Sequence, residues 1–352
     1  MKAAPTHLVR PAISRMEGYI PGEQPREAGF IKLNTNENPY PPSAHVLERL
    51  RQACGGDLRL YPDAAALGVR QRLARIFCVP PEATIVGNGS DELLNLVIRT
   101  FVDPGQVVAY PQPTYSYYRT LVDIQGGRIV TVDFPDDYRL PDDVLVPGAQ
   151  VTLLANPNAP SGTLTPVSRV AELAARIEGI LVVDEAYVDF AEDGCVHLVQ
   201  QHPRTIVLRT MSKSYSLAGM RIGFGFAHPE LIAQVWKLKD HYNVNRLSLV
   251  AAEAALDDID VMRERAAVIT ARRDRLSAAL RGLGFHVWES AANFVLARIA
   301  APPAAHLYAE LKQRRILVRH FDQPRLQDCL RISVGTEEEQ ERLLSELAGL
   351  VR

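Results

Sequence analysis

From about residue 45 to residue 250, short apolar runs alternate with longer segments of helical period, and this alternation restricts the fold strongly. Each apolar run suits one buried strand, and each helical segment is long enough to cross back over a sheet. The alternation therefore predicts an α/β domain with a mainly parallel seven-stranded sheet. The expected strands are 84–86, 107–110, 128–132, 150–155, 180–184, 205–209 and 222–227.

The helices of this domain are expected to begin at Ser90, Tyr115, Pro166 and Pro229. Thr165 is an expected N-cap, because a proline at the first helical position follows it. Beyond Asp257 the pattern changes to one long charged helix, about 261–281, and then to short strands and helices. This mixture predicts a separate α+β domain, whose expected strands are 285–289, 293–297, 316–319 and 329–334.

These patterns divide the chain into three parts. Residues 1–43 are rich in proline, which removes ladder donors and breaks helices, so they are expected to form an arm over the surface. We assign this arm to the small domain. Residues 44–256 are the expected large domain, and residues 257–352 are the expected small C-terminal domain.

The charge balance excludes some classes of partner. The chain has 39 Lys and Arg against 41 Asp and Glu, a formal charge of −2, which argues against binding to nucleic acid or an anionic membrane. The longest apolar stretches, such as 179–183, are too short to span a membrane, and the N-terminal segment has no signal-peptide core. A cytoplasmic location is therefore expected.

The cysteines and histidines indicate no metal site. The four cysteines form no Cys-x-x-Cys pair, and the nine histidines are scattered without a metal-binding cluster. A secreted disulfide framework is equally unsupported. We expect buried thiols at Cys54, Cys78, Cys195 and Cys329.

The segment ILVVDEAYVDF, residues 180–190, runs from apolar residues directly into Asp184. This places a carboxylate at the carboxyl end of a buried strand, the edge of a parallel sheet where ligands bind. An isolated buried charge is costly, so the carboxylate needs a partner, and a cationic ring nitrogen of a ligand would serve. Taken alone, the pattern equally allows an aspartate that caps the next helix or pairs with an arginine.

The segment TIVLRTMSKSYSLAGMRIGFGF, residues 205–226, contains a second candidate group. A β-rich run ends shortly before Lys213, which lies between Ser212 and Ser214 rather than in charged surroundings. Arg221 then opens another apolar strand, where its guanidinium could bind a phosphate together with the Ser212 hydroxyl. By itself, this motif is interpreted more simply as an ordinary surface lysine.

The segment TIVGNGSDELLNLVIRTF, residues 84–101, contains a strand, a glycine turn, and Ser90-Asp91 at the start of an amphipathic helix. Backbone N–H groups at such a helix start bind phosphate well. As an isolated motif, an ordinary turn with a helix cap is the simpler interpretation. Tyr115 in PQPTYSYY and the turn NPNAPSG, residues 156–162, follow two further expected strands.

Together these groups lie at one edge of one sheet, and they are the parts needed to hold pyridoxal phosphate. Lys213 would form the Schiff base with the aldehyde, and Asp184 would keep the pyridine nitrogen protonated. The phosphate would be bound by Ser90, Ser212 and Arg221. Once an incoming amine displaces it, Lys213 could move the proton between the substrate carbon and the cofactor carbon.

The chain closely resembles the fold-type I pyridoxal-phosphate aminotransferases, and within them the histidinol-phosphate aminotransferases. The resemblance covers almost the whole chain, and its most specific motifs are SKSYSLAGMRIGF, residues 212–224, and LRISVGT, residues 330–336. Weaker matches are KLNTNENPYPPS, RLYPD, GNGSDELL, PTYSYY, NPNAPSG and VDEAY. The resemblance implies a large domain that binds pyridoxal phosphate, a smaller α+β domain, and a homodimer with shared active sites.

The same resemblance implies roles for individual residues. Lys213 is the lysine bonded to the cofactor, and Asp184 binds the pyridine nitrogen. Tyr187 hydrogen-bonds the ring hydroxyl, and Tyr115 stacks on the ring. The residues implied around the phosphate are Ser90, Asp91, Ser212 and Arg221, with Tyr61 reaching it from the partner subunit.

One position departs from the family pattern. The family usually has Asn-Pro-Thr-Gly where this chain has Ala159-Pro160-Ser161-Gly162, so the asparagine expected on the ring hydroxyl is an alanine. Asn158 is the residue expected to reach the hydroxyl instead, with Asn156 as the alternative. Pro160 is expected, again by resemblance, to follow a cis peptide bond.

The resemblance also implies where the substrate binds. The superfamily arginine matched by Arg331 binds an α-carboxylate, and Arg319 and Tyr19 resemble positions that hold a substrate phosphate. Asn36, in KLNTNENPYPPS, is a further expected substrate contact. Histidinol phosphate has no carboxylate, so its phosphate can occupy the site that the glutamate carboxylate uses. Without the resemblance, these arginines would be interpreted as solvated residues or an interdomain ion pair.

The expected activity is transamination between L-histidinol phosphate and 2-oxoglutarate, with glutamate as the other product, in histidine biosynthesis. An aromatic amino-acid aminotransferase and a threonine-phosphate decarboxylase of the same fold stay open as alternatives. A cofactor-free binding protein is a third, although the presence of Lys213, Asp184 and Arg221 argues against it.

Overall fold

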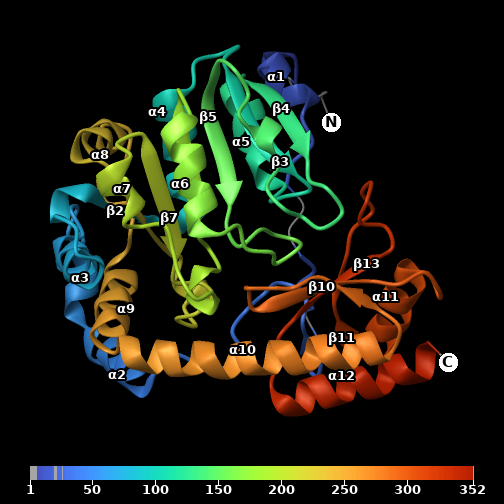
Figure 1. Ribbon diagram of the computed structural model, residues 1–352. Coiled ribbons are helices and arrows are strands. Elements are labelled where there is room, and N and C mark those ends of the chain that lie inside the picture. Colours follow the sequence, from blue (N-terminus) through green and yellow to red (C-terminus); the bar gives the residue numbers. More distant parts are fainter. Residues whose placement is uncertain (1–5, 20–21, 26, 352) are drawn as a thin grey trace.

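The structure is a computed structural model that describes residues 6–19, 22–25 and 27–351, and it has a larger and a smaller domain (Figure 1). The larger domain contains one seven-stranded sheet, ordered β2-β8-β7-β6-β5-β3-β4. β8 is antiparallel to both of its neighbours, and the other paired strands are parallel, which confirms a mainly parallel sheet. The strands are β2 (Thr84–Asn88), β3 (Val107–Gln112), β4 (Arg128–Asp133), β5 (Ala149–Ala155), β6 (Ile180–Asp184), β7 (Thr205–Thr210) and β8 (Ile222–Phe226).

Helices cover both faces of this sheet. Alternate residues of a strand point to opposite faces, so β6 sends Ile180 and Val182 into one hydrophobic core and Leu181 and Val183 into another. Burial on both faces explains why these strands read as continuous apolar runs. The first core contains α4 (Ser90–Phe101), α5 (Tyr117–Gln125) and α8 (Pro229–Trp236), and the second contains α2 (Ala44–Ala53), α3 (Leu67–Phe77), α6 (Val167–Arg176), α7 (Leu198–Gln201) and α9 (Arg246–Asp257).

Short 3-10 helices connect these elements. In the large domain they are η2 (Gly56–Arg59), η3 (Pro81–Ala83), η4 (Asp142–Val144), η5 (Val188–Phe190) and η6 (Ala218–Met220). Two of them, η5 and η6, follow or precede strand ends at the edge of the sheet where the candidate residues lie.

The smaller domain is built on an antiparallel sheet of order β12-β13-β10-β9. Its own core forms where this sheet packs against α11 and α12. The long helix α10 (Ile259–Gly282) runs beneath the large domain and continues under the small one, joining the two (Figure 1). The other elements are β9 (His286–Val287), β10 (Phe294–Arg298), α11 (Ala304–Gln313), β12 (Arg319–His320), β13 (Cys329–Ser333) and α12 (Glu337–Leu350).

The N-terminal arm contacts both domains. Its early part forms η1 (Thr6–Leu8) and α1 (Pro11–Arg15), and α1 packs on α5 of the large domain. Its later part forms β1 (Ile31–Lys32), which pairs in parallel with β11 (Ile316–Leu317) of the small domain. The domain boundaries 1–43, 44–256 and 257–352 stay a prediction.

The strand predictions for the large domain agree with the structure to within two residues at either end. Two helix starts differ. α5 begins at Tyr117 rather than at Tyr115, and α6 begins at Val167, with Pro166 at the N-cap position instead of Thr165. The reason is local, because the Asn156 amide accepts from the Thr165 N–H over 2.7 Å and donates to its carbonyl over 3.0 Å. These two bonds hold Thr165 outside the helix.

The small domain differs from the prediction in one respect. The single strand expected at 316–319 is two strands, because β11 pairs with the arm and β12 pairs with β13. β1 was not predicted, since a strand of two residues carries no periodic signal.

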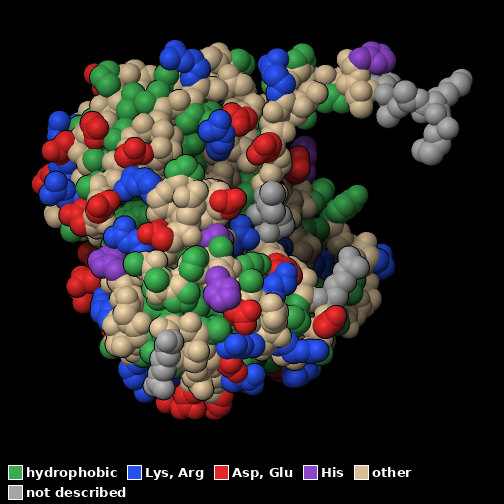
Figure 2. Space-filling model, turned by 90° about the vertical axis from the view of Figure 1, so that its right-hand side faces the viewer, with side chains coloured by type: hydrophobic (Ala, Val, Ile, Leu, Met, Phe, Trp, Pro, Cys, Tyr) green, Lys and Arg blue, Asp and Glu red, His purple; other side chains and the backbone are tan. Residues whose placement is uncertain are grey.

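The surface corrects one further expectation. Cys195 and Cys329 are buried as expected, but Cys54 and Cys78 are exposed because they end helices α2 and α3 at the surface. Acidic and basic side chains are interspersed over most of the face that Figure 2 shows. Among the residues described, no helix combines the length and hydrophobicity needed to cross a membrane.

Candidate active site

A cavity of about 300 Å³ lies at the carboxyl edge of the large sheet, where the large domain, the small domain and the arm meet. Residues that follow β2, β3, β6 and β7 reach this edge because those strands are parallel. β8 runs the opposite way, so Arg221, which precedes it, reaches the same edge. The topology thus brings together candidates that are far apart in the sequence. Those that line the cavity are Tyr19, Asn36, Ser90, Asp91, Tyr115, Asp184, Tyr187, Ser212, Lys213, Arg221, Arg319 and Arg331.

Asp184 lies at the end of β6 and is 5% exposed. Its carboxylate accepts from the Tyr118 hydroxyl over 2.9 Å and from the Ala186 N–H over 3.2 Å. Burial raises its pKa to about 6, although the Tyr118 hydrogen bond opposes the shift. The next residue, Glu185, is paired with Arg209 at 2.8 Å, whereas no cation of the described chain pairs with Asp184. The carboxylate is therefore free for a cationic partner in the cavity.

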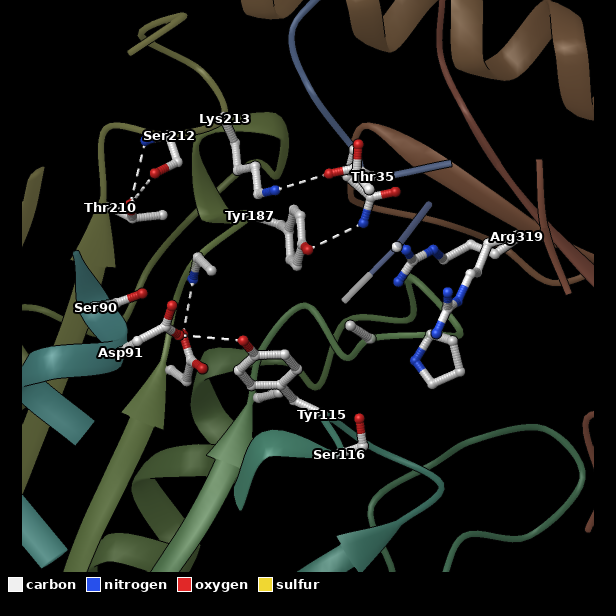
Figure 3. Close-up of a pocket in the computed structure, with 18 of the residues that line it drawn as sticks. Thr35, Ser90, Asp91, Tyr115, Ser116, Tyr187, Thr210, Ser212, Lys213 and Arg319 are labelled. Carbon is white, nitrogen blue, oxygen red and sulfur yellow. Dashed lines mark hydrogen bonds between the residues drawn. The ribbon is translucent and has the colours of Figure 1, made fainter. Parts of the chain in front are cut away.

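Lys213 follows β7 and extends into the cavity (Figure 3). Its ammonium donates to the Thr35 carbonyl of the arm over 3.1 Å and lies 5.7 Å from the centre of the Tyr187 ring. Within the described ranges no carboxylate forms an ion pair with it. An amine held in this way can reach a ligand between β6 and β7 without first breaking a salt bridge.

The part of the cavity beside α4 has the features of an anion site. Ser90 and Asp91 form the first turn of α4, whose N–H groups have no acceptor inside the helix. The Arg221 guanidinium lies beside this turn, 3.2 Å from the Asp91 carboxylate. Ser212 is buried and its hydroxyl accepts from the Thr210 hydroxyl over 2.9 Å. A phosphate at this point would meet a cation, two hydroxyls and a helix start.

Two glycines give this anion site its shape. Gly89 has φ +83°, in the region that favours glycine, and a Cβ there would lie 2.6 Å from an Arg221 nitrogen. A Cβ on Gly223 would lie 2.3 Å from the Ser90 nitrogen, so β8 can approach α4 only without a side chain. These glycines therefore allow the arginine and the helix start to lie side by side.

Tyr115 forms one wall of the cavity, with its hydroxyl donating to Asp91 over 3.1 Å. Burial, reinforced by the Asp91 charge, raises the pKa of Tyr115 well above its ordinary value, so the phenol stays neutral. Its ring meets Tyr118 edge-on at 5.5 Å, which fixes its orientation.

Arg319 and Arg331 lie across the cavity from this tyrosine, on the small domain (Figure 3 labels Arg319). Arg331 donates to the Asn34 carbonyl over 3.0 Å, and its Nε is buried with no partner. Both guanidiniums lie over the Phe321 ring, at 5.4 and 5.5 Å. No carboxylate in the described ranges pairs with either of them, so this end of the cavity is a second anion site.

Comparison with known proteins agrees with this geometry. A profile of the family described as "Aminotransferase class I and II" matches residues 28–347. The chain belongs to the class I and II aminotransferases. The "Histidinol-phosphate aminotransferase" of Geotalea uraniireducens is 47% identical to it over 340 residues, covering 96% of this chain and 98% of that protein. "Histidinol-phosphate aminotransferase 1" of Trichormus variabilis is 43% identical, and the match covers 99% of this chain and 100% of that protein.

A solved structure is also similar to this aminotransferase. The histidinol-phosphate aminotransferase from Sinorhizobium meliloti, determined in complex with pyridoxal-5'-phosphate, superposes with a TM-score of 0.91. It is 29% identical, and the match covers 100% of this chain and 99% of that one. This confirms the fold-type I architecture expected from the sequence.

The residues of this aminotransferase fit pyridoxal phosphate. Asp184 is a buried carboxylate with no cationic partner among the described residues, which complements a protonated ring nitrogen. The first turn of α4 with Arg221 and Ser212 complements a phosphate dianion, and Lys213 offers an amine in the same cavity. Three sets of side chains in one cavity thus match the ring nitrogen, the phosphate and the aldehyde of one ligand.

The structure corrects the placement of Asn158. Its amide oxygen accepts from Thr114 over 2.8 Å, and its amide nitrogen donates to Ser161 over 2.9 Å, so the loop uses both ends. The amide of the alternative, Asn156, is hydrogen-bonded at both ends to the Thr165 backbone. Neither asparagine lines the cavity, whereas Ala159 and Pro160 do. The cis bond expected before Pro160 is present.

Tyr61 does not line the cavity of its own chain. It is 76% exposed and stacks on Tyr242, with ring centres 4.3 Å apart. The contact expected with the phosphate of a partner subunit stays a prediction.

Sequence reasoning missed residues whose roles depend on backbone placement. Tyr118 donates to Asp184, and its spacing three residues after Tyr115 in PTYSYY was the available signal. Thr210 donates to Ser212, and it lies in the same motif as Lys213. Thr35 offers a carbonyl to Lys213, which no residue type could have signalled.

Proposed function

We propose that this aminotransferase transfers the amino group of L-histidinol phosphate to 2-oxoglutarate, with pyridoxal phosphate bound in the cavity, as a step of histidine biosynthesis. The observation that carries the proposal is the Arg319–Arg331 pair, which faces the cavity with no carboxylate partner in the described chain. Two guanidiniums suit a phosphate, and they suit a carboxylate equally well. The substrate names come from the curated relatives.

The cofactor would lie between Asp184 and the first turn of α4. When bound, pyridoxal phosphate carries the amino group on its aldehyde carbon and takes up electrons in its cationic ring. Asp184 holds the proton on the ring nitrogen, because a buried carboxylate gains most from that cation. Ser90, Ser212 and Arg221 hold the phosphate. Tyr115 forms the wall that keeps water from one side of the ring.

Lys213 is the residue that moves the proton. Its Nζ donates to the Thr35 carbonyl over 3.1 Å, and its flexible side chain extends into the cavity where the substrate would bind. With a substrate amine on the cofactor, the amine of Lys213 would be free to accept the Cα proton and to return it. No other amine lines the cavity in the described part of the chain.

The arginine pair orients both substrates. The phosphate of histidinol phosphate and a carboxylate of glutamate are anions of similar size, and each can bridge Arg319 and Arg331. Tyr19 lies near these guanidiniums, and its partial burial raises its pKa although both arginines oppose the shift, so it offers a neutral hydroxyl at the same end. One cationic end therefore serves the two half-reactions in turn.

We also propose a homodimer with shared active sites. Leu58, Leu60, Tyr61, Leu67 and Tyr242 are large hydrophobic residues that are exposed, and Tyr61 stacks on Tyr242. Exposed apolar residues of this kind suit burial against a second copy of the chain. In that arrangement Tyr61 would reach the phosphate of the partner's cofactor. A cytoplasmic location stays a prediction.

A substrate panel tests the function. Histidinol phosphate, phenylalanine and threonine phosphate are supplied as amino donors, with 2-oxoglutarate as acceptor, and glutamate and carbon dioxide are measured. We expect the highest kcat/KM with histidinol phosphate, accompanied by a spectral change from the aldehyde to the amine form of the cofactor. A higher value with phenylalanine would favour an aromatic aminotransferase, and carbon dioxide from threonine phosphate would identify a decarboxylase. A protein that stays colourless with added cofactor would instead be a cofactor-free binding protein.

A further inference from the structure

Asn36 lies where the arm meets both domains. It is 1% exposed, and its backbone has φ +56°, in the left-handed region that asparagine tolerates. Its N–H donates to Ser333 Oγ over 2.9 Å, and its carbonyl accepts from Asn293 Nδ2 over 3.0 Å. Hydrogen bonds to the small domain therefore fix the backbone of this residue.

The side-chain amide of Asn36 is also fixed at both ends. Its Nδ2 donates to Tyr187 Oη over 3.0 Å, and its Oδ1 accepts from Ser333 Oγ over 3.1 Å. Ser333 has a single hydroxyl proton, which goes to Oδ1, while its oxygen accepts the Asn36 N–H. This pairing keeps the NH₂ group of the amide toward Tyr187.

The amide determines where the Tyr187 proton can go. A phenol has one proton to donate, and the atom of Asn36 that faces it is itself a donor, so the proton must point elsewhere. In the part of the chain that the structure describes, no atom accepts that proton. Tyr187 lines the cavity beside Lys213, and Figure 3 shows its hydroxyl bonded to the amide on one side. The proton is therefore available to an acceptor inside the cavity.

We propose that Asn36 is a positioning residue that directs the Tyr187 hydroxyl proton toward the ring oxygen of bound pyridoxal phosphate. This inference rests on the proposed function, because the acceptor is the cofactor. Ser333 supports Asn36 from β13, the strand that also carries Arg331. Asn36 also lines the cavity, and its expected contact with substrate stays a prediction.

The positioning role has a spectroscopic consequence. The ring oxygen shares a proton with the cofactor-bound nitrogen of Lys213. A hydrogen-bond donor on the ring oxygen draws electron density from it, so that proton is held less tightly and its pKa is lower. The visible absorption of the bound cofactor titrates with that proton. The midpoint of a spectral pH titration therefore reports on the Tyr187 donor without any turnover.

Asn36→Asp tests the proposal directly, because aspartate has the same shape, tolerates the same backbone and presents an acceptor to Tyr187. We expect the spectral midpoint to rise by about one pH unit or more, the effect of losing a hydrogen bond to a charged group. The added negative charge also raises the midpoint. The same substitution in a Tyr187→Phe background measures the charge alone, and the proposal requires a smaller rise there. Equal rises in the two backgrounds would overturn it.

Ser333→Ala tests the same role without adding a charge, and it can be measured even if Asn36→Asp fails to fold. Without the Ser333 hydroxyl, the amide is free to turn, so we expect a smaller rise of the midpoint, and none in the Tyr187→Phe background. A midpoint equal to that of the wild type would contradict the positioning role while leaving the proposed function intact. A wild-type protein without the visible band would overturn the proposed function, and this inference with it.

Discussion

Arg319 and Arg331 are direct partners across the antiparallel strands β12 and β13, so two guanidiniums face the same cavity from one small sheet. Burial lowers the pKa of Arg331, and the neighbouring Arg319 charge acts in the same direction. Two like charges without a carboxylate between them repel each other, which an anion bound to both would relieve. The pair is thus arranged for a ligand and not for the stability of the domain.

Removing one of these guanidiniums should weaken substrate binding. For Arg331→Met we expect kcat/KM for histidinol phosphate to fall about 10-fold to 100-fold, because a hydrogen bond to a charged group contributes about 1.5–3 kcal/mol. Steady-state kinetics with both substrates measures the effect. Arg342→Met, which removes an arginine of α12 paired only with Glu346, is the matched control and should leave kcat/KM unchanged. Equal losses in both variants would indicate a general effect of lost charge.

Lys213→Ala should abolish turnover while the protein stays folded. We expect kcat to fall at least about 1000-fold, because the group that moves the Cα proton is missing. The yellow absorption band of the bound cofactor should also disappear. Lys237→Ala removes a surface lysine near the end of α8 and should keep both the band and the activity. Retention of both in the Lys213 variant would refute the assignment.

Asp184 should make the stability of the cofactor-free protein depend on pH. Its folded pKa of about 6 lies above the ordinary value of 3.8, so the folded state keeps the proton that the unfolded state releases. Its contribution is therefore most favourable below pH 3.8 and is lost as the pH rises through 6. The loss amounts to about 3 kcal/mol for a fully buried group.

Urea unfolding of the cofactor-free protein and of Asp184→Asn measures this effect. We expect the difference in free energy of unfolding, variant minus wild type, to increase by up to about 3 kcal/mol between pH 4 and pH 7.5. Added pyridoxal phosphate should reverse the loss of wild-type stability with rising pH, because the ring cation stabilises the ionised carboxylate. A difference that does not change with pH would contradict the raised pKa.

Gly89→Ala should weaken cofactor binding through the anion site. The substitution places a Cβ 2.6 Å from an Arg221 nitrogen and adds about 1–3 kcal/mol of backbone strain, because φ +83° with ψ 162° is a conformation essentially confined to glycine. We expect the Kd for pyridoxal phosphate to rise about 10-fold, as measured by absorption titration. Gly105→Ala also places an alanine at positive φ, +86°, with nothing within 4 Å of the new Cβ. That control should lose stability without losing cofactor affinity.

Much of the fold and the centre of the site could be predicted from the sequence. The strands of the large sheet are buried on both faces, so their apolar runs identified them, and Asp184 stood out because it ends such a run. Lys213 and Arg221 followed from a local motif and a family resemblance. These features depend on residues close together in the chain, where hydrophobic period and residue type carry the signal.

Asn158 shows where this reasoning stopped. The family resemblance implied an asparagine beside the cofactor, but the Asn158 amide is hydrogen-bonded to Thr114 and Ser161. Whether a nearby asparagine is free depends on the loop conformation, which engages Asn156 and Asn158 alike, and for Asn158 on a partner 44 residues away. Residue type cannot supply that information.

The sequence by itself determined the succession of strands and helices along the chain, the carboxylate and amine at the sheet edge, and the membership of a known family. Only the tertiary structure decided the register that pairs Arg319 with Arg331, the Tyr118 donor to Asp184, and the amide of Asn36 between Ser333 and Tyr187. The physical reason is that a hydrogen bond needs its two atoms within about 3 Å and correctly directed. Residues 151 and 297 positions apart meet that condition only once the domains have packed.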